Sequence, residues 1–131
     1  MILQVGVKAL IKRGDTFLFL RRSADFKNGE QAWDIPGGRI EPDEALESAL
    51  EREVFEETGM KELAVGQLVA AQDIFVEAKD LHVVRLTYTA TSEGEVRISD
   101  EHSEYRWMTK DEVLSESHID GYLKEVLESN I

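Results

Sequence analysis

The sequence predicts an α+β fold in which strands on either side of a central helix form an αβα layered sandwich. Strand-like segments, rich in apolar and β-branched residues and bounded by turn residues, occur both before and after the middle of the chain. Between them, residues 45–58 contain no Gly or Pro and are rich in Ala, Leu and Glu, which favours a helix. With 131 residues and no repeat or linker, we expect one domain, residues 1–131, with a sizeable core.

The elements are expected in a defined order. Residues 5–12 and 16–22 predict two strands joined by a hairpin turn at Arg13, Gly14 and Asp15. The continuous apolar run at residues 17–20 is typical of a strand that is buried on both faces. Beyond the central helix we expect one or two strands over residues 63–76, then a strand over 80–91 that ends in a turn at 92–94. A short strand over 105–108 should follow, and then a helix opening at 111–115 and an amphipathic helix over 119–129.

The central helix has recognisable ends. Asp43 is predicted to be its N-cap, and Glu44 would lie in the first turn, where negative charge suits the helix dipole. Gly59 is the expected C′ residue, because glycine readily adopts the left-handed conformation that ends a helix. An apolar stripe should hold the helix against the core, and it consists of Leu46, Ala49, Leu50 and Val54.

Three acids on this helix stand out. Glu53, Glu56 and Glu57 are spaced i, i+3 and i+4, so their carboxylates share one face and would repel each other. A hard cation removes this repulsion, because Mg²⁺ and Mn²⁺ prefer carboxylate oxygen and keep open positions for water and phosphate. A solvated surface would explain an arbitrary acidic run. The fixed spacing from the acids to the neighbouring glycines and to Arg52 favours a metal site instead.

Two further features surround the acids. Gly37 and Gly38 would let the backbone approach phosphates closely as it turns into the helix. Arg52 can pair with Glu44 or orient Glu53, because a planar guanidinium holds a carboxylate in a fixed geometry.

Residues 38–60, which read Gly-x5-Glu-x7-Arg-Glu-Val-x-Glu-Glu-x-Gly-Met, resemble the Nudix box at every defined position. Residues 33–38 and 101–107 are similar to the segments that flank the box in that family. The resemblance implies the Nudix α/β/α sandwich, with a mixed sheet and a catalytic loop-helix-loop. It also implies an enzyme that hydrolyses a diphosphate linkage in a nucleoside diphosphate attached to another group.

The resemblance assigns roles to the acids of the box. Glu53, Glu56 and Glu57, with the carbonyl of Gly37, would hold Mg²⁺ or Mn²⁺. Glu53 would be the general base, oriented by Arg52.

Residues around these acids would complete the site. Glu44 would be structural within the site and would pair with Arg52. Glu101 resembles the acid that a later loop contributes to metal binding in MutT-like members, and it competes with Glu53 for the role of base. Glu104 is a weaker candidate.

Contacts to the substrate are expected from Gly38, Arg21 and Arg22, with an ordinary surface role for Arg22 equally favoured. Trp33 could stack on a base, although a core position is favoured. The favoured reaction, by similarity to MutT-like enzymes, converts a nucleoside triphosphate into the monophosphate and pyrophosphate. The alternatives are hydrolysis of ADP-ribose or of a dinucleoside polyphosphate, or a non-catalytic nucleotide sensor, although sensors usually lack box acids that are present here.

Composition excludes several other classes. The net charge of −12 argues against binding to a nucleic acid polymer, and it makes a polyanionic substrate depend on metal and local cations. The absence of Cys excludes disulfides and thiolate chemistry. Without a signal peptide or an apolar run long enough to span a bilayer, the expected location is the cytoplasm. Many Nudix proteins dimerise, so a homodimer is compatible with the resemblance, although no surface stripe demands one.

Overall fold

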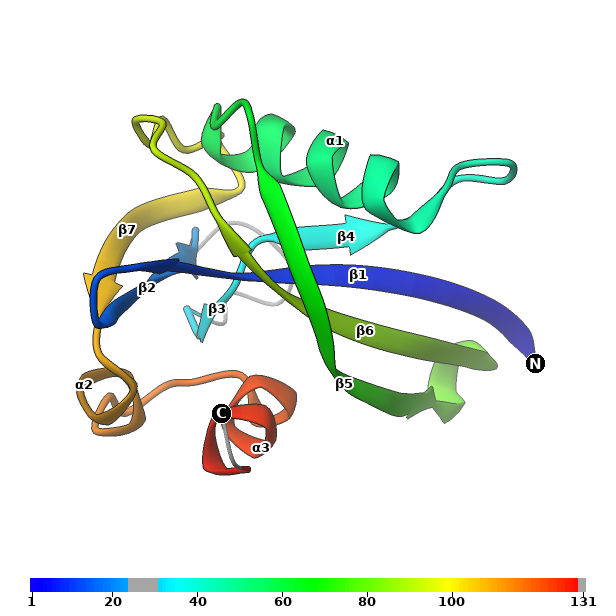
Figure 1. Ribbon diagram of the computed structural model, residues 1–131. Helices are drawn as coiled ribbons and strands as arrows, with labels where there is room; N and C mark the ends of the chain where they lie inside the picture. The colour runs from blue at the N-terminus through cyan, green and yellow to red at the C-terminus, as the bar shows by residue number, and fades with distance from the viewer. Residues whose placement is uncertain (24–30, 130–131) are drawn as a thin grey trace.

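The computed structural model describes residues 1–23 and 31–129, and it has three layers (Figure 1). A mixed sheet separates α1 (Leu46–Thr58) on one side from α2 (Lys110–Leu114) and α3 (Gly121–Glu128) on the other. The expected α/β/α sandwich is therefore confirmed. No helix in residues 1–23 or 31–129 is long and apolar enough to cross a membrane.

The sheet is built around its first strand. The strands are β1 (Ile2–Arg13), β2 (Thr16–Arg22), β3 (Trp33–Asp34), β4 (Gly37–Arg39), β5 (Ala64–Val76), β6 (Leu81–Thr91) and β7 (His102–Met108), with a short 3₁₀ helix at Glu77–Lys79. Their order is β3-β2-β1-β6-β5, with β4 paired to β1 and β7 paired to β2. β1 runs parallel to β6 but antiparallel to β2 and β4, so the predicted mixed sheet is present.

Alternation along β1 creates two cores. Val7, Ala9 and Ile11 are fully buried and pack with Leu50 and Val54 of α1. Leu10 belongs to a second cluster on the other side of the sheet, which includes residues of α2 and α3. Successive side chains of a strand point to opposite faces, so one strand contributes to both cores.

Trp33 belongs to this second cluster and is 1% exposed, which confirms the core position rather than base stacking. Its indole Nε1–H donates to Glu116 Oε1 at 3.0 Å. The polar end of the ring is thereby satisfied although the ring is buried.

The start of α1 differs from the prediction. Asp43 is not the N-cap, because its φ of 67° places it in a left-handed turn before the helix. Ala45 is the N-cap residue, makes no side-chain capping bond, and leaves Glu44 outside the first turn. Leu46 is 37% exposed and does not contribute to the buried stripe, whereas Ala49, Leu50 and Val54 do. At the other end the prediction is confirmed, because Gly59 is left-handed with φ 71°.

The remaining boundaries move by small amounts. β2 matches its predicted range, whereas β1, β5, β6, β7, α2 and α3 begin or end a few residues from theirs. The expected segment at 63–76 is one strand, not two. β3 and β4 were not expected, since each is very short and β4 contains the glycine pair.

Candidate active site

Two glycines of β4 bring the backbone against the acids of α1. The Gly37 N–H donates to Glu57 Oε1 at 3.0 Å. A Cβ on Gly38 would collide with the carboxylate of Glu53, and one on Gly37, where φ is 148°, would collide with the backbone of Val7. A side chain on Gly38 would push β4 away from α1, and one on Gly37 would push it away from β1, so this close packing requires glycine at both positions.

Arg52 organises the helix acids through both edges of its guanidinium. Its Nε and Nη2 donate to the two carboxylate oxygens of Glu44 at 2.7 and 2.9 Å. Its Nη1 donates to Glu53 Oε1 at 2.8 Å and to Glu56 Oε1 at 2.9 Å, and its Nη2 reaches the Arg39 carbonyl at 3.1 Å. Both predicted partners of Arg52 are thus confirmed, and the fixed fork orients Glu53.

The pKa of Glu44 reflects this pairing. The Arg52 hydrogen bonds and the N–H of Glu41 lower the pKa of Glu44 to about 2, because they favour its ionised form. The guanidinium of Arg52 is stabilised in return, and its pKa is raised. Glu44 is therefore an ionised structural partner across the neutral pH range.

Glu53 and Glu57 behave in the opposite way. Burial raises the pKa of Glu57 to about 7, and repulsion from Glu53 and Glu101 adds to this effect. Lys8 and the Gly37 N–H oppose the rise without cancelling it. Burial likewise raises the pKa of Glu53, with repulsion from Glu56 and Glu101, despite its bonds to Arg52. The nearby positive charges of Arg52 and Lys8 do not offset burial and repulsion at these two carboxylates, and a bound cation would add the positive charge that is missing.

The predicted metal ligands are not arranged as a closed cage. Within residues 1–23 and 31–129, no three His, Cys, Asp or Glu side chains are grouped closely enough to hold a metal ion as they stand. Glu56 is 52% exposed and turned toward Arg52, and Glu57 Oε1 accepts the hydrogen bond from the Gly37 N–H. These donors still fit a hard divalent cation, which prefers carboxylate oxygen. The raised pKa values of Glu53 and Glu57 show that too little positive charge surrounds their ionised forms.

The end of β2 lies beside Glu101. The Ser23 N–H donates to the Glu101 carbonyl at 3.0 Å, and Arg22 pairs with His102 in the β2–β7 ladder. The structure therefore brings Arg22 to the same edge as Glu101, and Glu101 near Glu53 and Glu57.

Arg21 points to a different partner. Its Nη1 lies 2.9 Å from Glu104 Oε1, its Nε donates to the Gln31 carbonyl at 3.2 Å, and its guanidinium lies over the Trp33 ring. Glu104 also contacts Arg106 at 3.3 Å, so its carboxylate is held between two arginines. These contacts account for Arg21 and Glu104 as structural partners of each other, without a role in the candidate active site.

A buried cluster of charges was missed by sequence reasoning. Arg85 of β6 is 6% exposed, and its Nη2 and Nη1 bond to the two oxygens of Asp34 at 2.9 and 3.3 Å. Lys8 Nζ lies 3.4 Å from Asp34, and Asp120 lies 3.4 Å from Arg85. Burial alone would raise the pKa of Asp34, but Lys8 and Arg85 hold it well below its usual range. The one sequence signal was a charged residue at an alternating position within each of two apolar strands.

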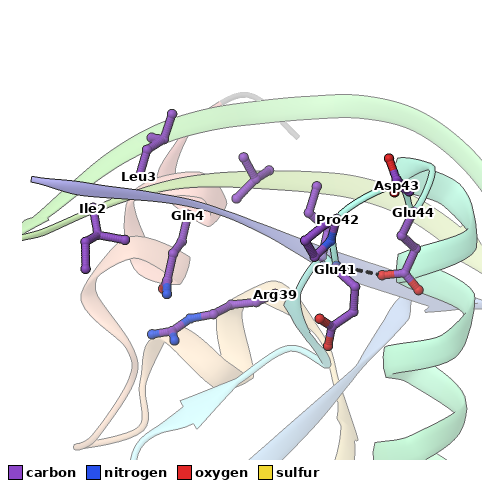
Figure 2. A pocket seen from close by; sticks show the side chains of 10 residues that line it. Ile2, Leu3, Gln4, Arg39, Glu41, Pro42, Asp43 and Glu44 are labelled. Atoms are coloured by element: carbon purple, nitrogen blue, oxygen red, sulfur yellow. Dashed lines mark hydrogen bonds between the residues drawn. The ribbon is translucent and has the colours of Figure 1, made fainter.

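A pocket of about 560 Å³ opens beside Glu44, between the start of β1 and the loop before α1 (Figure 2). Its lining includes Gln4, Arg39 and Glu44 but none of Glu53, Glu56 and Glu57. The bond from the Glu41 N–H to Glu44 Oε1, at 2.9 Å, closes the loop on one side of it (Figure 2). Glu44, which accepts hydrogen bonds from Arg52, thus also lines this pocket.

Comparisons with known proteins identify the family and the fold of the chain. The family model described as NUDIX domain matches residues 2–127. A "MutT-like protein" of Streptomyces ambofaciens is 34% identical over 126 residues, which cover 95% of this chain and 75% of that protein. A protein of Escherichia coli K12 named "CTP pyrophosphohydrolase" is 33% identical over 110 residues, 82% of this chain and 77% of its own. The crystal structure of the MutT protein from Methanosarcina mazei Go1 superposes with a TM-score of 0.84 at 30% identity, covering 96% of this chain and 91% of that one.

Proposed function

The chain belongs to the Nudix hydrolase family, and we propose that it converts a nucleoside triphosphate into the nucleoside monophosphate and pyrophosphate. Nudix hydrolases act on nucleotide-like substrates. The proposal of a triphosphate is supported by the names of two relatives, a "CTP pyrophosphohydrolase" and a "Nucleoside triphosphatase", each of which aligns with 80% or more of this chain. The single observation that carries it is Glu53, a carboxylate 17% exposed, gripped by Arg52 and packed against the Gly38 backbone.

Nudix hydrolases generally use divalent metal ions, and we propose Mg²⁺, with Mn²⁺ as a substitute. Glu53, Glu56, Glu57 and Glu101 would hold it, with the Gly37 carbonyl as a further oxygen ligand. Bound there, a divalent cation supplies neutralisation of phosphate charge and a more acidic water. Glu56 Oε1 lies 2.9 Å from the Arg52 guanidinium, so Glu56 would bind the metal through its second carboxylate oxygen or give up that bond.

Glu53 is proposed as the general base. Arg52 Nη1 holds its Oε1 at 2.8 Å and so fixes the direction of the carboxylate. Its raised pKa makes it a better proton acceptor than an exposed Glu, because basicity increases with pKa. Glu101 remains the competing candidate, since it is close enough to raise the pKa of both Glu53 and Glu57.

Substrate phosphates must approach a protein of net charge −12. We propose that Arg22 and the Gly38 backbone receive them, because Arg22 lies at the Glu101 edge and Gly38 has no side chain in the way. Arg21 would take part only if it left Glu104, from which it is 2.9 Å distant.

The test is release of pyrophosphate, phosphate and nucleoside monophosphate in Mg²⁺ and in Mn²⁺. The panel holds CTP, the other canonical and oxidised nucleoside triphosphates, ADP-ribose and diadenosine polyphosphates. Equal amounts of monophosphate and pyrophosphate from a triphosphate support the proposal. Turnover of ADP-ribose or a dinucleoside polyphosphate alone would replace it with that substrate class, and nucleotide binding without turnover of any of them would favour the sensor.

A further inference from the structure

Lys8 occupies an unusual place for a lysine. It lies in the middle of β1 between the buried residues Val7 and Ala9, and its side chain is only 15% exposed. Because side chains alternate along a strand, Lys8 faces away from α1, on the same side of the sheet as Leu10. Burial of an ammonium group is costly unless it is paired and hydrogen-bonded, so its contacts require an explanation.

Those contacts are with the turn that leads into β4. Lys8 Nζ donates to the Ile35 carbonyl at 3.1 Å and lies 3.4 Å from Asp34 Oδ2. The next residue of β1, Ala9, donates its N–H to the Pro36 carbonyl at 2.9 Å. Two consecutive residues of β1 thus hold two consecutive carbonyls of the turn, which fixes the orientation of its peptide planes.

The next residue of the turn is Gly37, which touches the acids. Lys8 and Gly37 are directly paired in the β1–β4 ladder, and a Cβ on Gly37 would lie 2.9 Å from Lys8 Cδ. On its other side, the Gly37 N–H donates to Glu57. Lys8 therefore supports the backbone that contacts Glu57, and its positive charge also favours the ionised form of that carboxylate.

Arg85 does not duplicate this role. Arg85 binds the carboxylate of Asp34 from β6, whereas Lys8 Nζ also donates to the Ile35 carbonyl, one residue further along the turn. Removing the ammonium of Lys8 would leave Asp34 paired with Arg85, so the fold has a second cation to retain that acid. The turn would lose the Lys8 bond to the Ile35 carbonyl while keeping the Ala9 bond to the Pro36 carbonyl.

We propose that Lys8 is a positioning residue of the hydrolytic site, which holds the 34–37 turn so that Gly37 keeps its place against Glu57. The catalytic part of this inference rests on the proposed function. Lys8 does not touch the reacting atoms, and its effect acts through Gly37. Its role should therefore be visible in the backbone without substrate.

The test compares Lys8→Met, which removes donor and charge, with Lys8→Arg, which keeps both. Lys12→Met is the matched control, because Lys12 lies in the same strand and is exposed. Three quantities are measured: hydrogen exchange of the Gly37 amide without metal, Mn²⁺ binding by electron paramagnetic resonance, and kcat and KM for the best triphosphate. If Lys8→Met does not fold, Lys8→Gln replaces it and keeps a neutral donor.

We expect Gly37 exchange in Lys8→Met to be about tenfold faster and kcat about tenfold lower, with KM changed less than about threefold. In Lys8→Arg the exchange rate of Gly37 and kcat should both return most of the way to their wild-type values. Lys12→Met should match the wild type in both. The proposal would be overturned if, in Lys8→Met, the Gly37 exchange rate and the Mn²⁺ affinity both stayed within about twofold of wild type. If the wild type hydrolyses no triphosphate, the proposed function fails, yet exchange and Mn²⁺ binding still decide the role of Lys8.

Discussion

Glu57 and Asp34 are both buried acids beside Lys8, yet their pKa values move in opposite directions. The pKa of Glu57 is raised to about 7, whereas that of Asp34 is held well below its usual range. Burial raises both values, so the difference comes from the neighbours. Asp34 has two cations against it, Lys8 and Arg85, while Glu57 has Lys8 and the Gly37 N–H but also the repulsion of Glu53 and Glu101.

The comparison separates a completed charge cluster from an incomplete one. Around Asp34 the protein supplies its own positive charge and satisfies the carboxylate, which suits a structural role. Around Glu57 and Glu53 it gathers carboxylates and leaves them short of positive charge. Because a bound cation would stabilise the incomplete cluster, we propose a functional role for Glu57 and Glu53 and a structural one for Asp34.

The largest expected effect is in the incomplete cluster. Glu53→Gln keeps the shape of the side chain but removes its basicity and charge, so kcat should fall by about 10² to 10⁴-fold. Steady-state hydrolysis measures the loss, and circular dichroism checks that the fold is kept. Glu47→Gln, an exposed acid on the same helix, is the control and should stay near wild type. If Glu53→Gln keeps its rate and Glu101→Gln loses it, Glu101 is the base.

The next effect is in the completed cluster. Asp34→Asn removes the carboxylate that Lys8 and Arg85 share and leaves Arg85 only the 3.4 Å contact with Asp120, so the free energy of unfolding should fall by about 3 kcal/mol. Urea denaturation measures the change. Asp73→Asn is the matched control, because Asp73 is 64% exposed and pairs only with His82 among the described residues. Equal stability of the two variants would mean that the Asp34 cluster contributes little.

A third prediction concerns pH in the metal-free protein. The folded pKa of Glu57 lies above its unfolded value of 4.5, so the folded state binds more protons between these values. Stability should therefore be highest below about pH 4.5 for this group and fall by roughly 2–3 kcal/mol as pH rises through about 7. Urea midpoints across this range measure the fall, and Glu57→Gln should flatten it. Saturating Mg²⁺ should raise stability most at high pH, where the carboxylate is ionised. A fall that persists in Glu57→Gln would assign it to another group.

The smallest effect is expected outside both clusters. Glu104→Gln weakens the pairs with Arg21 and Arg106, which are partly exposed and contribute at most about 1 kcal/mol. Activity should stay within about twofold of wild type, measured on the same triphosphate as Glu53→Gln. A loss as large as that of Glu53→Gln would mean that Glu104 belongs to the site and that the ranking of the acids is wrong.

The residues of α1 were predictable because their signals are local. Helix propensity, the i, i+3, i+4 spacing of the acids and Gly59 all act within a few residues, and the Arg52 contacts to Glu44, Glu53 and Glu56 lie within one segment. The N-cap was wrong for a physical reason. Asp43 adopts a left-handed turn, and the chain needs two more residues before the helix begins.

The Asp34 cluster was not predictable, because its members come from four distant segments. Lys8, Asp34, Arg85 and Asp120 meet only once β1 is paired with β6 and α3 has packed on the sheet. Strands β3 and β4 have the same cause, since two or three residues carry no periodicity and become strands only through their partners. Local patterns therefore located the helix of the candidate site but not the framework behind it.

The parallel pairing of β1 with β6 also constrains when the protein can fold. β1 is made before β6, yet residues 2–11 of β1 pair with residues 81–90 of β6, so this ladder must wait for the later part of the chain. Contacts between segments so far apart in sequence form slowly, because a long loop must close before they are gained. On the ribosome, the acidic helix would emerge before the strand that completes the platform beneath it. The newly made first strand, apolar along one face, would spend that interval without its central partner and exposed to other chains.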